Sequence, residues 1–135
     1  MTNPFDILVL TAANEAQAAG YRAQLAWRCA NGLIHPDTET RVITDPGGRR
    51  VGSLGATLNV LTQVAGGRGV EAFAGRRILI CHSGGDSRRT PAYAAQGKVF
   101  TPVPATGPAG QPLALFDLIL RTVSALPAPA GGHVL

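Results

Sequence analysis

With 135 residues, the chain is long enough for a single domain with one hydrophobic core and leaves no obvious room for a second. An apolar fraction of 45% and a charged fraction of 15% exclude a disordered or fibrous protein. The net charge of +4 favours an anionic partner such as a nucleotide or a nucleic acid. Nearly all of the positive charge is arginine, because Lys98 is the single lysine.

The first β-α unit is predicted at the N-terminus. The apolar run at residues 5–13 is typical of a buried parallel strand. Asn14 is a suitable N-cap, and Gln17 three residues later completes a pattern similar to a capping box. The helix that follows is expected to end at Gly32 and to present an apolar face made of Ala18, Tyr21, Leu25 and Cys29.

The second unit is predicted in the next third of the chain. Alternating β-branched residues at 40–45 indicate a strand, which ends in the turn at 45–48. Residues 51–67 are rich in glycine, and we expect a loop followed by a helix that ends at Gly66. The apolar face of that helix is predicted to consist of Leu58, Leu61 and Val64.

The third unit begins with an apolar strand predicted at residues 76–83. Glycine and proline interrupt everything from 84 to 110, and a helix is expected after that, with Pro112 in its first turn. Its apolar face would be made of Leu113, Phe116, Leu120 and Val123. Residues 132–135 are similar to the start of a fourth strand that is cut off.

Strands that alternate with helices predict a three-layer, Rossmann-like α/β domain with a mostly parallel sheet and right-handed crossovers. In such sheets ligands bind at the carboxyl ends of the strands. The loops that follow Ala13, Asp45 and Ser83 are therefore the expected location of a binding site.

The loop after the third strand carries the strongest signal for phosphate binding. Gly84 and Gly85 permit a sharp turn in which successive backbone amides can face phosphate oxygens, and Ser87 adds a hydroxyl. A plain connection between two elements is the alternative. A P-loop is excluded because Ala92 and Val99 occupy positions that require glycine and a hydroxyl residue. The dinucleotide fingerprint fails because the two glycines are adjacent.

Arginine pairs add charge that suits phosphate, since the guanidinium fork binds two oxygens at once. They are Arg49 with Arg50, Arg76 with Arg77, and Arg88 with Arg89. For the first two pairs, a solvated charge at a strand edge is an equal alternative. Cys29 and Cys81 form no CxxC motif, so neither a metal knuckle nor a redox motif is indicated, and a reduced, cytoplasmic protein is expected. No apolar run approaches the roughly 18 residues of a membrane span, so no membrane is expected among the partners.

Several single residues are predicted to have structural roles. His82 ends an apolar strand and is interpreted as a hydrogen-bonding residue in preference to a catalytic base. Asp45 precedes Pro46 and is expected to form a turn, while Asp117 is expected to cap a helix or to be solvated. Trp27 and Phe116 are assigned to the core. No cluster of metal-ligating residues is visible in the sequence, and no metal ligand is assigned.

Residues 77–104 closely resemble the signature of the fucose-1-phosphate guanylyltransferases, or GDP-fucose pyrophosphorylases, including those joined to an L-fucokinase in one chain. The pattern is carried by His82, Gly84, Gly85, Ser87, Arg89, Pro91, Gly97, Lys98, Thr101 and Pro104. Residues 45–61 and 5–25 are similar to two upstream blocks of the same family. The resemblance implies that residues 1–135 are the N-terminal part of a nucleotidyltransferase domain of the GT-A-like type.

The resemblance also implies an activity. Fucose 1-phosphate would attack the α-phosphate of GTP, giving GDP-fucose and pyrophosphate, with a magnesium ion bridging phosphates. Gly84, Gly85 and Ser87 would cradle phosphates, Arg89 would bind pyrophosphate, and Lys98 would neutralise charge at the α-phosphate. Arg88 is a weaker candidate for a phosphate contact. The segment from Gly52 to Thr57, with Gly55 inside it, would lie near the base.

Three departures from the family pattern bear on this interpretation. Leu54 stands where the family usually has glycine, and Thr90 stands where it usually has leucine. The chain also ends at Leu135, before the strand that an acidic metal ligand follows in the family. We therefore expect a truncated enzyme whose magnesium ligand lies outside this chain, and a C-terminal kinase domain in longer relatives. The alternative is a non-catalytic module that binds nucleotides or other polyanions, with nucleic acid the less favoured partner.

Overall fold

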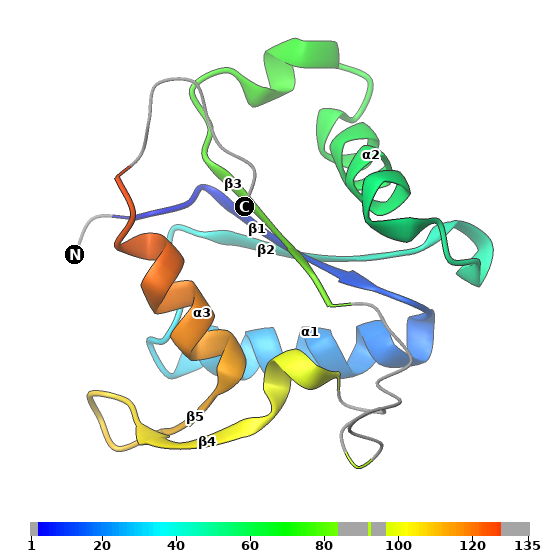
Figure 1. Ribbon diagram of the computed structural model, residues 1–135. Helices are drawn as coiled ribbons and strands as arrows, with labels where there is room; N and C mark the ends of the chain where they lie inside the picture. Colours follow the sequence, from blue (N-terminus) through cyan, green and yellow to red (C-terminus); the bar gives the residue numbers. More distant parts are fainter. Residues whose placement is uncertain (1–2, 84–91, 93–96, 128–135) are drawn as a thin grey trace.

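The computed structural model describes residues 3–83, 92 and 97–127 of the chain. A three-stranded parallel sheet with the order β2-β1-β3 lies between two layers of helices (Figure 1). The strands are β1 (Ile7–Ala12), β2 (Glu39–Thr44) and β3 (Ile78–His82), and the helices are α1 (Glu15–Ala30), α2 (Gly52–Ala65) and α3 (Leu115–Ser124). The α/β architecture with a parallel sheet that the sequence predicts is confirmed.

The central strand β1 separates two hydrophobic cores. All six of its residues are buried, as expected for a strand with a helix layer on each face. Successive side chains point to opposite faces of a sheet, so Leu8 and Leu10 pack under α1 whereas Ile7 and Val9 pack under α2. The α2 side is completed by Ile43, Val60 and Val64.

Helix α1 begins as the sequence predicts. The Asn14 side chain caps the helix by accepting a hydrogen bond from the backbone N–H of Gln17 at 2.9 Å. The Gln17 side chain reaches back to the backbone N–H of Ala13 at 2.9 Å, one residue before the position that a standard capping box uses. Ala18, Tyr21 and Leu25 face the core, but Cys29 is exposed and Arg28 is buried in its place.

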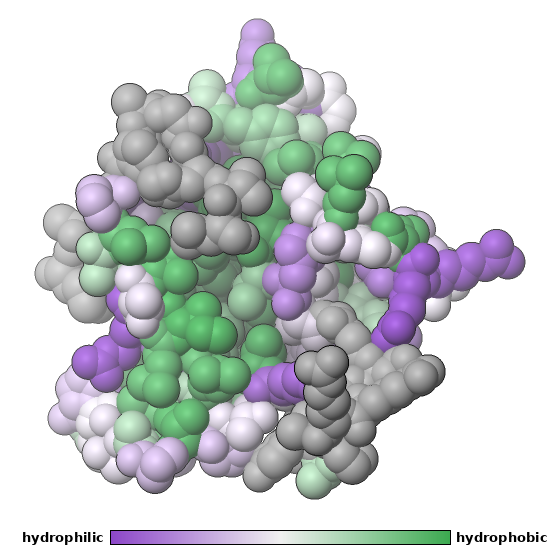
Figure 2. Space-filling model, viewed as in Figure 1, coloured by the Kyte–Doolittle hydropathy of each residue, from purple (hydrophilic) through white to green (hydrophobic). Residues whose placement is uncertain are grey.

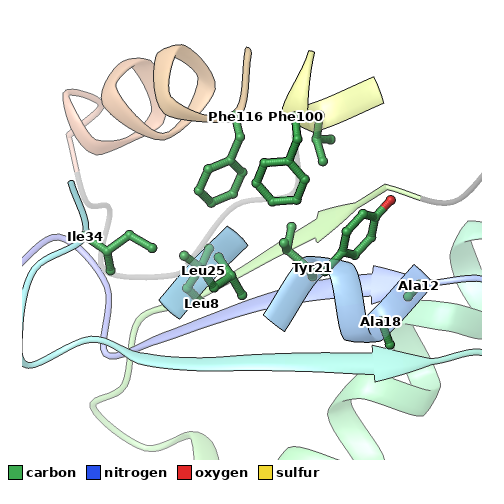
Figure 3. Packing of buried hydrophobic residues seen from close by; sticks show 10 residues of the cluster. Leu8, Ala12, Ala18, Tyr21, Leu25, Ile34, Phe100 and Phe116 are labelled. Atoms are coloured by element: carbon green, nitrogen blue, oxygen red, sulfur yellow. The ribbon is translucent and has the colours of Figure 1, made fainter. Parts of the chain in front are cut away.

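The layer beyond α1 contains elements that the sequence does not predict. Strands β4 (Pro102–Thr106) and β5 (Pro112–Ala114) form a separate antiparallel pair, and the short helix η4 (Lys98–Phe100) precedes them. Pro112 therefore opens a strand and not the helix that was expected, which begins only at Leu115. Figure 3 shows Tyr21, Phe100 and Phe116 joining this layer to α1, with ring centroids 5.4 Å apart in both neighbouring pairs. The fourth strand expected at residues 132–135 lies outside the described residues.

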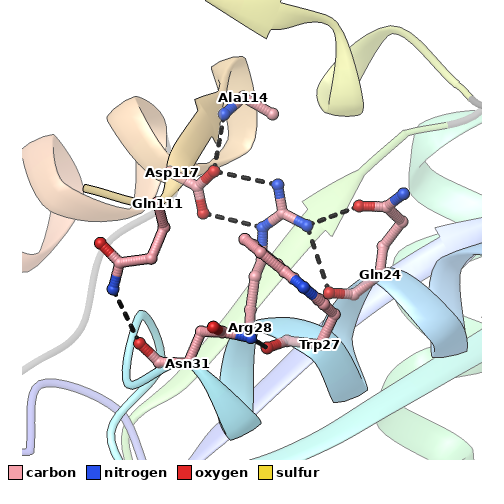
Figure 4. A network of polar contacts seen from close by, with 7 residues as sticks. All are labelled: Gln24, Trp27, Arg28, Asn31, Gln111, Ala114 and Asp117. Atoms are coloured by element: carbon pink, nitrogen blue, oxygen red, sulfur yellow. Dashed lines mark hydrogen bonds and ion pairs between the residues drawn. The ribbon is translucent and has the colours of Figure 1, made fainter. Parts of the chain in front are cut away.

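A buried ion pair connects α1 to α3 (Figure 4). Arg28 donates from Nε to Oδ1 of Asp117 at 2.8 Å and from Nη2 to Oδ2 at 2.9 Å, and both side chains are only 3% exposed. The other amino group of Arg28 donates to the backbone and side-chain oxygens of Gln24. Asp117 also accepts from the backbone N–H of Ala114 at 2.7 Å, so the capping role predicted for it is confirmed.

The assignment of Trp27 to the core is wrong, and in the predicted face of α2 Val64 is confirmed but Leu58 is not. Trp27, which was assigned to the core, is 39% exposed, because its neighbour Arg28 turns inward to meet Asp117. On α2 the sheet-facing residues are Ala56, Val60 and Val64, while Leu58 is 57% exposed. Apolar residues lie on both sides of α2, so their spacing alone does not decide which side faces the sheet.

Apolar surface also gathers over α3 on the face shown in Figure 2. Leu115, the first residue of α3, and Leu126, just after its end, are both more than a third exposed. Within the described residues, no helix has both the length and the apolar character that crossing a membrane requires.

The ion pair gives a stability prediction. Asp117→Ala leaves the Arg28 guanidinium buried without its carboxylate, and we expect the free energy of unfolding to fall by about 3–5 kcal/mol. The matched control is Glu39→Ala, which removes the exposed carboxylate paired with Arg41 and should cost less than about 1 kcal/mol. Urea unfolding followed by circular dichroism measures both changes. An equal loss of unfolding free energy in the two variants would contradict the assignment of Arg28 and Asp117 as a buried ion pair.

Candidate functional site

A pocket of about 220 Å³ opens at the carboxyl edge of the sheet. Its wall is built from the ends of all three strands and from the first turns of α2: Thr11, Ala12, Ala13, Asp45, Arg50, Gly52, Ser53, Ala56 and His82. The chain passes from β1 to β2 on one side and returns to β3 on the other, so the strand order reverses beside β1. Such a switch point is where open α/β sheets bind their ligands.

The beginning of α2 forms one wall of this pocket, and here the sequence-based prediction is wrong. Residues 52–57 form the first turns of α2 and not the loop that was expected. The first amides of a helix have no intrahelical partners and favour negative charge, and no side chain caps this helix. Leu54, the departure from the family's glycine, has a helical backbone and is 73% exposed, so it neither lines the pocket nor demands a positive φ.

Gly55 is required by the way the chain enters α2. A Cβ atom at this position would lie 2.7 Å from Cβ of Val51, closer than side-chain atoms approach one another. The glycine that the sequence analysis assigned to nucleotide binding therefore has a packing role, and it is not part of the pocket wall. Its role in binding a nucleotide stays a prediction.

His82 connects the end of β3 to both neighbouring elements. Its Nε2 lies 2.9 Å from Oγ1 of Thr57 on α2, and its Nδ1 lies 3.4 Å from Oγ1 of Thr11 on β1. The hydroxyl proton of Thr57 is directed at the backbone oxygen of Ser53, so we assign His82 as a donor from Nε2 and an acceptor at Nδ1. The interpretation of His82 as a hydrogen-bonding residue is confirmed. Thr57 is a partner of His82 and does not line the pocket.

Lys98 lies on the opposite face of the sheet from α2. It is exposed and begins η4, whose Val99 and Phe100 pack into the core under α1. It is not part of the pocket wall. The preceding residue, Gly97, packs on Tyr21, and the Tyr21 hydroxyl donates to the backbone oxygen of Ser83 at the end of β3. Lys98 thus lies next to residues that reach the carboxyl edge.

The remaining predicted site residues are not described by the structure. Gly84, Gly85, Ser87, Arg88 and Arg89 all lie outside the described residues, as does Thr90. The roles assigned to them stay predictions.

The pocket also contains residues outside the predicted set of catalytic and nucleotide-binding residues. Arg50 belongs to one of the arginine pairs considered for phosphate binding, and that pairing was the signal for it. Asp45 was expected only to form a turn, yet it lines the pocket. Ser53 carried no signal of its own. Among the described residues, no three histidine, cysteine or acidic side chains come together as a metal site would require.

The fold and this pocket define an α/β domain with its candidate ligand site at the carboxyl edge of a parallel sheet. Residues 70–134 match the family model described as the fucose pyrophosphorylase domain, and the chain belongs to this family. No solved structure was found to match it.

Named relatives extend the match beyond that model. The chain is 37% identical to the bifunctional fucokinase/GDP-fucose pyrophosphorylase of Arabidopsis thaliana over 89% of its own length and 14% of the relative's. It is 35% identical to the fucose-1-phosphate guanylyltransferase of Homo sapiens over 82% of its length and 18% of the relative's. The L-fucokinase/L-fucose-1-P guanylyltransferase of Bacteroides fragilis is 42% identical over 45% of this chain and 7% of its own. The chain thus spans less than a fifth of each of these relatives.

Two glycines in helices give a matched stability test. Gly55→Ala forces the new methyl group against Val51, and we expect the free energy of unfolding to fall by about 1–3 kcal/mol. Gly20→Ala in α1 adds a methyl group in open space and should raise it by up to about 1 kcal/mol through helix propensity. Denaturant titration measures both, and a Gly55→Ala protein as stable as the parent would show that the close contact with Val51 is not present.

Proposed function

We propose that the chain provides nucleotide-handling elements of a fucose-1-phosphate guanylyltransferase, which makes GDP-fucose and pyrophosphate from GTP and fucose 1-phosphate. The observation that carries this proposal is the pocket at the carboxyl edge, where Arg50 and the uncapped start of α2 favour an anionic ligand. The names of the relatives supply the reaction and the sugar.

The chemistry suits a site that offers a positive charge and free backbone amides, as Arg50 and the first turn of α2 do here. A phosphate oxygen of fucose 1-phosphate forms a bond to the α-phosphorus of GTP, and the bond between that phosphorus and the oxygen bridging to the β-phosphate breaks. The electron pair leaves with pyrophosphate. Such a transfer needs positioned reactants and stabilised charge more than covalent participation by the protein.

In this proposal Lys98 neutralises charge at the α-phosphate and Arg89 binds the departing pyrophosphate. Gly84, Gly85 and Ser87 donate to phosphate oxygens, with Arg88 as an additional contact. Gly55 and Thr57 act indirectly near the base, because the first turns of α2 that contain them also carry the pocket wall at Ser53 and Ala56.

The complete domain, its location and its cofactor are also proposals. We propose that the three-stranded sheet is part of a larger Rossmann-like, GT-A-like nucleotidyltransferase domain in a cytoplasmic enzyme, which is joined to a kinase domain in longer chains. Magnesium is proposed as the cofactor; it is commonly held by one or two carboxylates together with substrate phosphates. Its acidic ligand is proposed to lie outside this chain, as the resemblance to the family implies.

Lys98 offers a direct test because it is the single lysine of the chain. An amine-reactive label at residue 98, quantified by peptide mass spectrometry, should be slowed by GTP if Lys98 contacts the nucleotide. Pyrophosphate release from GTP, magnesium and fucose 1-phosphate should fall about 100-fold or more in Lys98→Ala, the loss expected when one charge-stabilising group is removed. Arg121→Ala, which removes an exposed cation from α3, is the control and should release pyrophosphate at the parent rate.

The competing function, a polyanion-binding module, makes a different prediction. Heparin or polyphosphate would then protect Lys98 as well as GTP does, the protection would weaken steeply with salt, and no pyrophosphate would form. An unchanged affinity for GTP after replacing both Lys98 and Arg89 with alanine would show that the nucleotide does not bind where we propose.

A further inference from the structure

Tyr21 contacts both ends of the segment that carries most of the predicted phosphate contacts. On one side, its hydroxyl donates a hydrogen bond to the backbone oxygen of Ser83 at 3.2 Å. Ser83 is itself fixed to the sheet, because its hydroxyl donates to the backbone oxygen of Thr11 at the end of β1. On the other side of the segment, Gly97 packs against the Tyr21 ring.

The contact with Gly97 is very close. A Cβ atom at this position would lie 2.7 Å from Cζ of Tyr21 and would overlap its hydroxyl oxygen. Gly97 also has φ of +75°, a conformation that glycine adopts without steric cost. A residue with a side chain could not bring the backbone so near the Tyr21 ring, and it would be strained at this positive φ.

A second contact fixes the same short helix. The rings of Tyr21 and Phe100 meet edge to face, with their centroids 5.4 Å apart. Lys98 therefore lies between two residues, Gly97 and Phe100, that both touch Tyr21. Backbone hydrogen bonds from Phe100 to Gly97 and from Thr101 to Lys98 close the turn around it.

The phenol is suited to a fixed role as a hydrogen-bond donor. Tyr21 is 1% exposed, and its burial raises the pKa of the phenol above its usual value. The hydroxyl thus stays protonated at neutral pH and keeps donating to Ser83. Tyr21 does not line the pocket and has no part in the proposed reaction.

We propose that Tyr21 is a positioning residue, whose hydroxyl and ring hold Ser83 and Gly97 together and so place Lys98 at the carboxyl edge for contact with the nucleotide phosphates. The inference rests on the proposed function, because it assigns Tyr21 an effect through Lys98. A positioning role differs from a purely structural role of Tyr21 in one respect. Removing the Tyr21 hydroxyl should weaken GTP binding only while Lys98 is present.

The test is a double-mutant cycle on GTP affinity, measured by titration calorimetry on the full chain. Tyr21→Phe keeps the ring against Phe100 and removes the hydrogen bond to Ser83. We expect it to weaken GTP binding about 2- to 10-fold, the range that one hydrogen bond of ordinary strength corresponds to. In a Lys98→Ala background the same change should have no further effect. Thr122→Val, which removes a hydroxyl from the exposed side of α3, is the control and should leave the affinity unchanged in both backgrounds.

Circular dichroism confirms that each variant is folded before the titration. An equal loss of affinity with and without Lys98, or no loss in either background, overturns the positioning role of Tyr21 and leaves the proposed function standing. A parent protein that does not bind GTP at all overturns the proposed function, and the role of Tyr21 with it.

Discussion

The buried pair of Arg28 and Asp117 fixes how the second layer of the protein docks. A guanidinium and a carboxylate removed from water need partners for their hydrogen-bonding groups, and here Gln24 and the backbone N–H of Ala114 supply the rest. The Arg28 guanidinium also lies 4.7 Å from the ring centroid of Phe100. Because α3 and η4 both contact this one charged group, its hydrogen bonds and ring contact constrain how both elements dock on α1. Lys98, two residues before Phe100, takes its position from that docking.

The carboxyl edge is organised around Thr11 at the end of the central strand. The Thr11 hydroxyl contacts one ring nitrogen of His82, and the other ring nitrogen contacts the Thr57 hydroxyl on α2. The Thr11 backbone oxygen accepts a hydrogen bond from the Ser83 hydroxyl. The backbone oxygen of Ser83 in turn accepts a hydrogen bond from the Tyr21 hydroxyl on α1. One residue of β1 thus links the start of α2 with the middle of α1. A shift of α1 or α2 would be transmitted through these hydrogen bonds to the carboxyl edge on both faces of the sheet.

Local patterns predicted the three strands of the parallel sheet and α1, because short apolar runs and an N-cap such as Asn14 act within a few residues. The start of α2 could not be predicted in this way, since Gly55 is typical of a loop and is needed in the helix only because Val51 comes so close to it. The inward turn of Arg28 depends on a carboxylate 89 residues away. In the site, an arginine pair pointed to Arg50, whereas the contacts of Tyr21 with Ser83 and Gly97 depend on long-range packing that spacing cannot reveal.

Arg50 and Lys98, the two cations of the described residues that the proposed function uses, lie on different faces of the sheet. Arg50 belongs to the pocket beside α2, and Lys98 belongs to the layer over α1, with the ends of β1 and β3 between them. Under the proposed function, one ligand that contacts both groups must be extended and must carry its charge along its length. A nucleoside triphosphate meets that requirement, whereas a single compact anion would be held by one face alone.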